Sequence, residues 1–197
     1  MNVMINSRPL RVLHQRTFSQ RLGEILHFCL GSILSLRAFD PSEKEIQSLI
    51  NKALAYHHEP LEDRVHLRDE ASKILQNIQK ANLWKDLQNL LENKFPIYRE
   101  LEGYFGLEEK LLRPDLLAKG DREWLLLEFK LKEEQLNEEQ LTLYCSFLKT
   151  IFPDHTIKVY AVIFQPPKLK FIKALSPTRD YHESPSLPRT TQLSLFK

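Results

Sequence analysis

Residues 124–131 of the 197-residue chain have the sequence Trp-Leu-Leu-Leu-Glu-Phe-Lys-Leu. The apolar residues occupy both odd and even positions, which indicates a central strand covered on both faces by helices. Side chains alternate along a strand, so Glu128 and Lys130 are expected on one face. Unpaired charges in a buried strand are costly, and such charges are usually functional or paired with each other. The alternative is a surface hairpin with scattered charges.

Turn residues precede this run. Residues 119–122 are Lys-Gly-Asp-Arg, which predicts a hairpin between strands at 111–118 and 123–131. Two further strands are expected at 97–105 and 157–164. A charged, helix-forming segment at 133–150 separates the last two strands, which indicates a crossover and therefore a mixed sheet. The fold class expected is α/β.

The chain before residue 95 has a helical pattern. Apolar residues recur at helical spacing after Ser19, which we expect to be an N-cap, and a second helix at 43–57 has Ser42 as its cap. Further helices are expected at 61–79 and 83–92. We predict a single domain over 1–166, with a helical part at about 19–94 and a sheet part at about 95–166. Residues 167–197, rich in Ser, Pro and Thr from 176 to 190, are expected to form a flexible tail.

Composition excludes several classes of protein. The chain is 42% hydrophobic and 27% charged, which is typical of a globular domain, and its net charge of +2 is uninformative about partners. Five glycines argue against a Gly-rich phosphate loop, and no apolar run approaches the roughly 20 residues that span a bilayer. Cys29 and Cys145 are expected to be buried thiols of a cytoplasmic protein.

Asp115 and the pair Glu128 and Lys130 carry the predicted chemistry. Hydrolysis of a phosphodiester needs a divalent cation that neutralises the phosphate and generates hydroxide. Carboxylates on neighbouring strands of a hairpin suit Mg²⁺ or Mn²⁺, which prefer oxygen ligands. Lys130 beside them is suited to orient the attacking water or to stabilise negative charge.

This order of residues resembles the RecB/AddA-type branch of the PD-(D/E)XK nucleases, over about residues 19–164. Arg-Leu-Gly-Glu-Ile-Leu-His at 21–27 is similar to the helical G-x-x-x-H element of that branch, and Glu-x-Lys at 128–130 follows Asp115 as in its signature. Tyr-Arg-Glu at 98–100 resembles the acidic segment before the hairpin, with Glu102 as an alternative to Glu100. Gln140 and Tyr144 match the Q-x-x-x-Y motif.

The resemblance implies a restriction-endonuclease-like sheet and a deoxyribonuclease of DNA repair or recombination. It implies that His27, Asp115 and Glu128 bind Mg²⁺ or Mn²⁺ and that Glu100 helps directly or through water. Gln140 and Tyr144 would contact the DNA backbone or steady Lys130. An iron–sulfur cluster is not expected, because two cysteines cannot supply four ligands.

Simpler interpretations exist for the supporting residues. A lone histidine on an apolar helix face is often a core or boundary residue, which applies to His27. Gln140 and Tyr144 could pack on the sheet as an amide and a ring. The adjacent His57 and His58 lack ligand spacing to a third group and are interpreted as a helix end.

The C-terminal residues Gln192, Leu193, Leu195 and Phe196 belong to the sequence Gln-Leu-Ser-Leu-Phe, which resembles the pentapeptide that binds the bacterial sliding clamp. Leu195 and Phe196 would enter a hydrophobic pocket while Gln192 forms hydrogen bonds. The alternative is an apolar tail that docks on its own domain.

Two other functions stay open. The chain could be a non-catalytic adaptor that binds DNA and the clamp, although a scaffold has no reason to keep a metal site. It could instead cut RNA or serve as the accessory nuclease of a separate helicase, since the sequence has no Walker-type loop of its own.

Overall fold

The computed structural model describes residues 16–38, 40–100, 103–105 and 110–177. The helices are α1 (Phe18–Ser35), α2 (Glu43–Tyr56), α3 (Leu61–Lys80), α4 (Leu83–Leu91) and α5 (Glu138–Ile151), with a short 3-10 helix η1 (Glu133–Gln135) before α5. The strands are β1 (Ile97–Arg99), β2 (Gly103–Phe105), β3 (Lys110–Leu112), β4 (Leu116–Lys119), β5 (Glu123–Lys130), β6 (Thr156–Phe164) and β7 (Pro167–Leu175).

The main sheet has five strands in the order β1-β4-β5-β6-β7. Strands β5 and β6 are parallel, and the other neighbouring strands are antiparallel. Helix α5 connects the two parallel strands, as a crossover requires. The predicted α/β fold with a mixed sheet is therefore confirmed.

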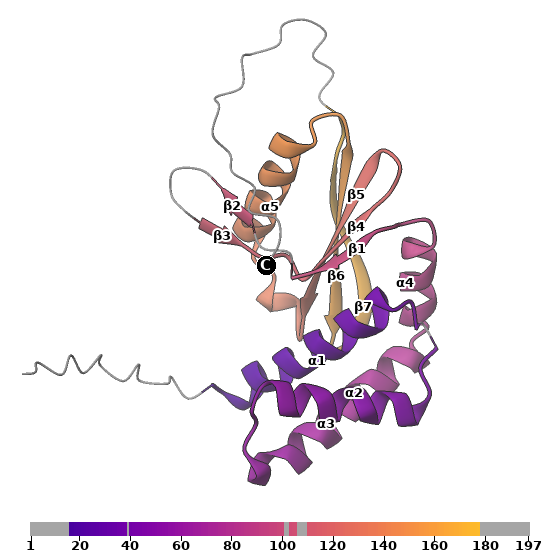
Figure 1. Ribbon diagram of the computed structural model, residues 1–197, viewed down its shortest axis with the longest axis vertical. Helices are drawn as coiled ribbons and strands as arrows, with labels where there is room; N and C mark the ends of the chain where they lie inside the picture. Colours follow the sequence, from indigo (N-terminus) through magenta and orange to yellow (C-terminus); the bar gives the residue numbers. More distant parts are fainter. Residues whose placement is uncertain (1–15, 39, 101–102, 106–109, 178–197) are drawn as a thin grey trace, which may run out of the picture.

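Strand β5 is central, and each of its faces packs against a different core. Leu125, Leu127 and Phe129 pack with the residues of α1 to α4, whereas Trp124 and Leu126 pack with α5. Figure 1 shows α1, α2 and α3 as one helical layer at an end of the sheet, with α5 lying along the sheet. Alternation along β5 places Glu128 and Lys130 on the α5 side.

The predicted helices are present, with one correction at a cap. Ser42 caps α2 as expected, because its side chain accepts from the Glu45 amide. The predicted cap Ser19 is wrong: Ser19 lies inside α1, and Thr17 accepts from the amide of Gln20 instead. Both residues are good caps, and the Gln three positions after Thr17 completes a capping box that Ser19 lacks.

A buried carboxylate ties α1 to the start of α3. The Glu59 side chain is fully buried, and it forms ion pairs with Arg16 at 3.0 Å and with Arg21 at 3.2 Å. Arg21 also binds Asp63 at 2.7 Å. A buried carboxylate needs such partners, and the result is a fixed position for α1, which carries His27.

Two predicted strands are each broken. The expected strand at 97–105 ends at Arg99, since Glu100 has φ 46°, a conformation that few non-glycine residues adopt and that ends the ladder. The expected strand at 111–118 divides into β3 and β4 around Pro114, which has no amide hydrogen to donate. Strands β2 and β3 pair with each other in a separate two-stranded sheet.

The tail was predicted to begin at residue 167, and this boundary is wrong. Residues Pro167–Leu175 form β7, an edge strand antiparallel to β6. A proline is tolerated as the first residue of an edge strand, so Pro166-Pro167 is a turn into a strand. The residues from 178 onward, with the predicted clamp-binding peptide, lie outside the described residues.

Cys29 and Cys145 are free and buried in α1 and α5. Burial raises the pKa of the Cys29 thiol to about 12, which makes a thiolate nucleophile unfavourable at neutral pH. None of the helices in the described part of the chain is long and apolar enough to cross a membrane.

Candidate active site

The β4–β5 hairpin brings Asp115 to the end of β5. Leu116 pairs with Leu127, so Asp115, one residue earlier, lies beside the residues that follow Leu127. Its carboxylate accepts a hydrogen bond from the Phe129 amide, with 2.6 Å between Oδ2 and N. This contact confirms that the turn at 119–122 places Asp115 at the Glu128 end of the partner strand.

Glu128 is the buried carboxylate of the site, with 3% of its surface exposed. Its Oε1 accepts from Lys130 Nζ at 2.7 Å, whereas its buried Oε2 has no hydrogen-bond partner. Burial, followed by the negative charge of Asp115, raises the pKa of Glu128 to about 7 against the opposing effect of Lys130. A second positive charge nearby would stabilise the ionised form of this carboxylate and lower its pKa.

Helix α1 adds His27 to the same site. His27 Nδ1 lies 3.2 Å from Asp115 Oδ1, and its ring packs edge-on against Phe129, with 5.6 Å between centroids. Gly23 lies one turn earlier, and a Cβ placed there would meet nothing within 4 Å. A small side chain at this position would therefore meet no described neighbour.

The carboxylates of Asp115 and Glu128 are donors that a hard divalent cation prefers, but the side chains do not surround one position. Among residues 16–38, 40–100, 103–105 and 110–177, no three His, Cys, Asp or Glu side chains gather in a metal-binding arrangement. Asp115 instead uses its oxygens for His27 and the Phe129 amide, and Glu128 uses one for Lys130. The unpaired Oε2 of Glu128 and the Asp115 carboxylate are oxygen donors of the kind that Mg²⁺ and Mn²⁺ prefer, whereas an imidazole such as that of His27 is more typical of other transition metals.

Helix α5 covers the site with Gln140 and Tyr144. Gln140 Nε2 donates to the Tyr144 hydroxyl, which donates to the Arg113 carbonyl at 3.2 Å. Burial and the nearby Glu128 charge raise the pKa of Tyr144 to about 12, so the phenol stays a donor. The pair therefore links α5 to the residues just before Asp115.

Glu100 lies at the edge of the site, and its neighbours include a histidine that sequence analysis assigned only to a helix end. The Glu100 amide donates to the Asp115 carbonyl at 3.2 Å. His57 is the C-cap of α2, and its Nδ1 lies 3.7 Å from Glu24 Oε2. Burial lowers the pKa of His57, and the carboxylates of Glu24 and Glu100 partly offset this.

The sequence could have indicated that Glu24 lies near the candidate site, because it comes three residues before His27 on α1 and so lies on a similar face of the helix. His57 could not, since its position beside Glu24 depends on the packing of α2 against α1. Glu102, the alternative to Glu100, lies outside the described residues.

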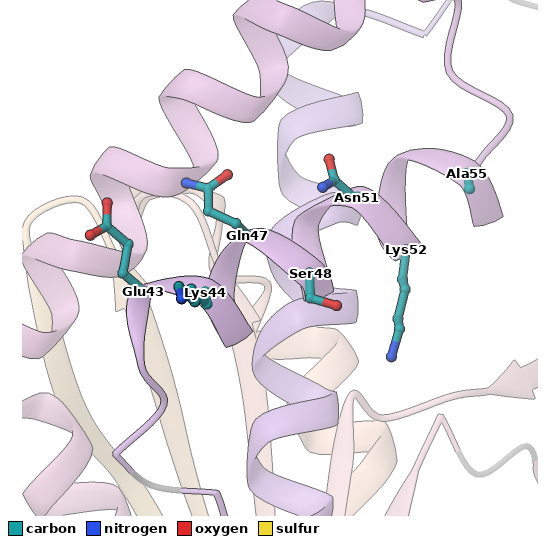
Figure 2. Close-up of a pocket in the computed structure, with 7 residues that line it drawn as sticks. All are labelled: Glu43, Lys44, Gln47, Ser48, Asn51, Lys52 and Ala55. Carbon is teal, nitrogen blue, oxygen red and sulfur yellow. The ribbon is translucent and has the colours of Figure 1, made fainter.

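A depression elsewhere offers no comparable chemistry. It has a volume of about 700 Å³ and lies over the exposed face of α2. Figure 2 shows that its lining side chains all come from this one helix and spread along it: Glu43, Lys44, Gln47, Ser48, Asn51, Lys52 and Ala55. Because these groups do not converge on one point, the hairpin is the better candidate site.

Comparison with known proteins adds little. No family model matches the sequence, and no curated protein matches it. A solved structure described as the crystal structure of protein VC1899 from Vibrio cholerae aligns with a TM-score of 0.30 and 14% identity. The alignment covers 77% of this chain and 48% of that chain, so this chain spans about half of that protein, and a similarity this low supports no conclusion about function.

Proposed function

We propose that this protein is a metal-dependent nuclease of the PD-(D/E)XK type that hydrolyses phosphodiester bonds in DNA. The observation that carries the proposal is the state of Glu128. This carboxylate is buried, has one unpaired oxygen, lies beside a second carboxylate and is neighboured by Lys130. A protein that used this strand only for packing would gain stability from an apolar residue here.

His27, Asp115 and Glu128 would hold Mg²⁺ or Mn²⁺. Bound there, the cation would neutralise the phosphate and lower the pKa of a water molecule. The Lys130 ammonium group donates to Glu128 Oε1. Released from this bond, it would orient the attacking water or stabilise the negative charge that develops on the phosphate.

The remaining residues would support this chemistry. The Gln140–Tyr144 pair holds the backbone at Arg113 and so steadies the segment that carries Asp115. Glu100, whose amide donates to the Asp115 carbonyl, would help the reaction directly or through a water molecule.

The cellular context is also a proposal. The residues Gln192, Leu193, Leu195 and Phe196 would tether the nuclease to a bacterial sliding clamp during DNA repair or recombination. A helicase partner would supply unwinding, since the sequence contains no Walker-type loop.

A measurement of metal binding distinguishes the proposed nuclease from a non-catalytic adaptor. We expect the wild-type protein to bind Mn²⁺ in a calorimetric titration and Asp115→Ala to bind it more than about tenfold more weakly, because a lost ligand costs at least as much as a lost supporting residue. Asp121→Ala, which removes an exposed carboxylate from the turn of the same hairpin, is the matched control. Equal affinity in wild type and Asp115→Ala would support the adaptor.

A further inference from the structure

A second cationic feature lies on the same face of the sheet as Glu128 and Lys130. Strand β7 carries Lys168 and Lys170, and both ammonium groups contact the carboxylate of Glu133 in η1. Each lysine binds a different oxygen, and the Lys170–Glu133 distance is 2.6 Å. A phosphate group is likewise an anion with several oxygens, and lysines bind phosphate as point charges.

The strand registers align these lysines with the candidate site. Lys130 pairs with Ile163, which pairs with Lys168. Glu128 pairs with Ala161, which pairs with Lys170. Paired residues on neighbouring strands point to the same face, so Lys168 and Lys170 lie on the same face of the sheet as Glu128 and Lys130, with β6 between β5 and β7.

The separation fits a DNA strand. Neighbouring strands lie about 4.8 Å apart, so β7 is about 10 Å from β5. A strand of B-form DNA advances about 3.4 Å per nucleotide. Because the strand also winds around that axis, successive phosphates are further apart than this rise, so a strand with one phosphate at Glu128 and Lys130 would place a phosphate one or two nucleotides away near Lys168 and Lys170.

A second carboxylate that contacts two lysines lies at the opposite end of the sheet and is more buried. Glu123 also contacts two lysines, Lys94 and Lys158. There the Glu123 and Lys94 side chains are only 20% and 16% exposed, whereas the Lys158 side chain is 41% exposed. On β7 both lysine side chains are exposed, at 43% and 44%, and Glu133 is 35% exposed, so another anion can reach both ammonium groups at once and displace the carboxylate.

We propose that Lys168 and Lys170 form a phosphate-binding site for the DNA strand outside the scissile position, and that Glu133 occupies this site in the free protein. This inference rests on the proposed nuclease function. The two ammonium groups lower the pKa of Glu133 to about 2, so its carboxylate is charged at every physiological pH. Incoming phosphate must displace it, which makes Glu133 a competitor of the substrate.

The test measures binding of the full chain to fluorescently labelled single-stranded and duplex DNA in EDTA, at several salt concentrations. The variant K168A/K170A should bind about five- to tenfold more weakly at about 0.1 M salt, with a salt slope shallower by about 0.7 to 0.9, because one phosphate contact is lost. Glu133→Gln should bind several-fold more tightly. K168R/K170R should retain affinity, and Lys158→Ala, at the far end of the sheet, should behave as wild type.

The proposal is overturned if K168A/K170A keeps the wild-type affinity and salt slope, or if Glu133→Gln fails to tighten binding. The second result would mean that Glu133 only fastens η1 to β7. Cleavage of the same DNA in Mn²⁺ is scored separately. If the DNA is cleaved but K168A/K170A binds as the wild type does, the proposed nuclease function holds and the proposed phosphate-binding site is rejected. If K168A/K170A binds more weakly but no DNA is cleaved, the phosphate-binding site holds and the nuclease function is rejected.

Discussion

Replacement of Lys130 by alanine is expected to lower the rate of DNA cleavage about 10²- to 10³-fold while DNA binding is retained. Lys130 provides the ammonium group nearest to Glu128, at 2.7 Å from its Oε1, and 19% of its side chain is exposed. Loss of one group that stabilises the charge of a transition state lowers the rate about 10²- to 10³-fold. The measurement is single-turnover cleavage of end-labelled DNA in Mg²⁺, together with binding in EDTA.

The control for this variant lies on the same hairpin. Lys119→Ala removes a lysine from the other end of β4, paired with Trp124, and should leave the rate unchanged. Cleavage by Lys130→Ala at the wild-type rate would show that Lys130 has no part in the reaction. A parallel loss of DNA binding would instead assign it to substrate affinity.

Replacement of Glu128 by glutamine is expected to stabilise the protein without metal and to abolish cleavage. The pKa of Glu128 is raised from 4.5 to about 7, mainly by burial and then by Asp115. Between these pH values the folded state binds a proton that the unfolded state has released, so the stability of the wild type falls as pH rises. Above pH 7 the variant should be more stable by about 1–3 kcal/mol.

The comparison requires denaturant unfolding of both proteins from pH 4 to pH 8. The advantage of Glu128→Gln should be absent below pH 4.5 and should grow until about pH 7. Glu123→Gln is a control of opposite sign on the same strand: burial raises the pKa of Glu123, but Lys158 and Lys94 outweigh it and lower that pKa. It should lose stability above pH 4.5, and a Glu128→Gln curve parallel to the wild type would refute the assigned charge state.

The elements with strong local signals were predicted well from sequence. The apolar run at 124–131 identified the central strand β5, and Ser42 identified the start of α2. The interruption at Glu100 was not predictable, because a positive φ at a glutamate is a local exception that surrounding contacts impose. Strand β7 was missed since two prolines mask the alternation of Lys168, Leu169, Lys170 and Phe171.

The site was predicted unevenly for a similar reason. Asp115 and Glu128 lie on one hairpin, whose turn fixes their relation in sequence. His27 comes from α1, almost ninety residues earlier, and only the family resemblance connected it to Asp115 before the structure placed the two side chains 3.2 Å apart. His57, Lys168 and Lys170 depend on helix packing and strand register, which no local pattern encodes.

The central claim is that Asp115 and its neighbours cut DNA with a divalent cation. The most direct measurement is cleavage of end-labelled single-stranded and duplex DNA by the full chain in Mg²⁺, in Mn²⁺ and in EDTA, with Asp115→Ala beside it and a matched RNA as a further substrate. We predict cleavage of DNA that requires metal and disappears in Asp115→Ala. Intact DNA under every condition, or equal cleavage by the variant, would contradict it.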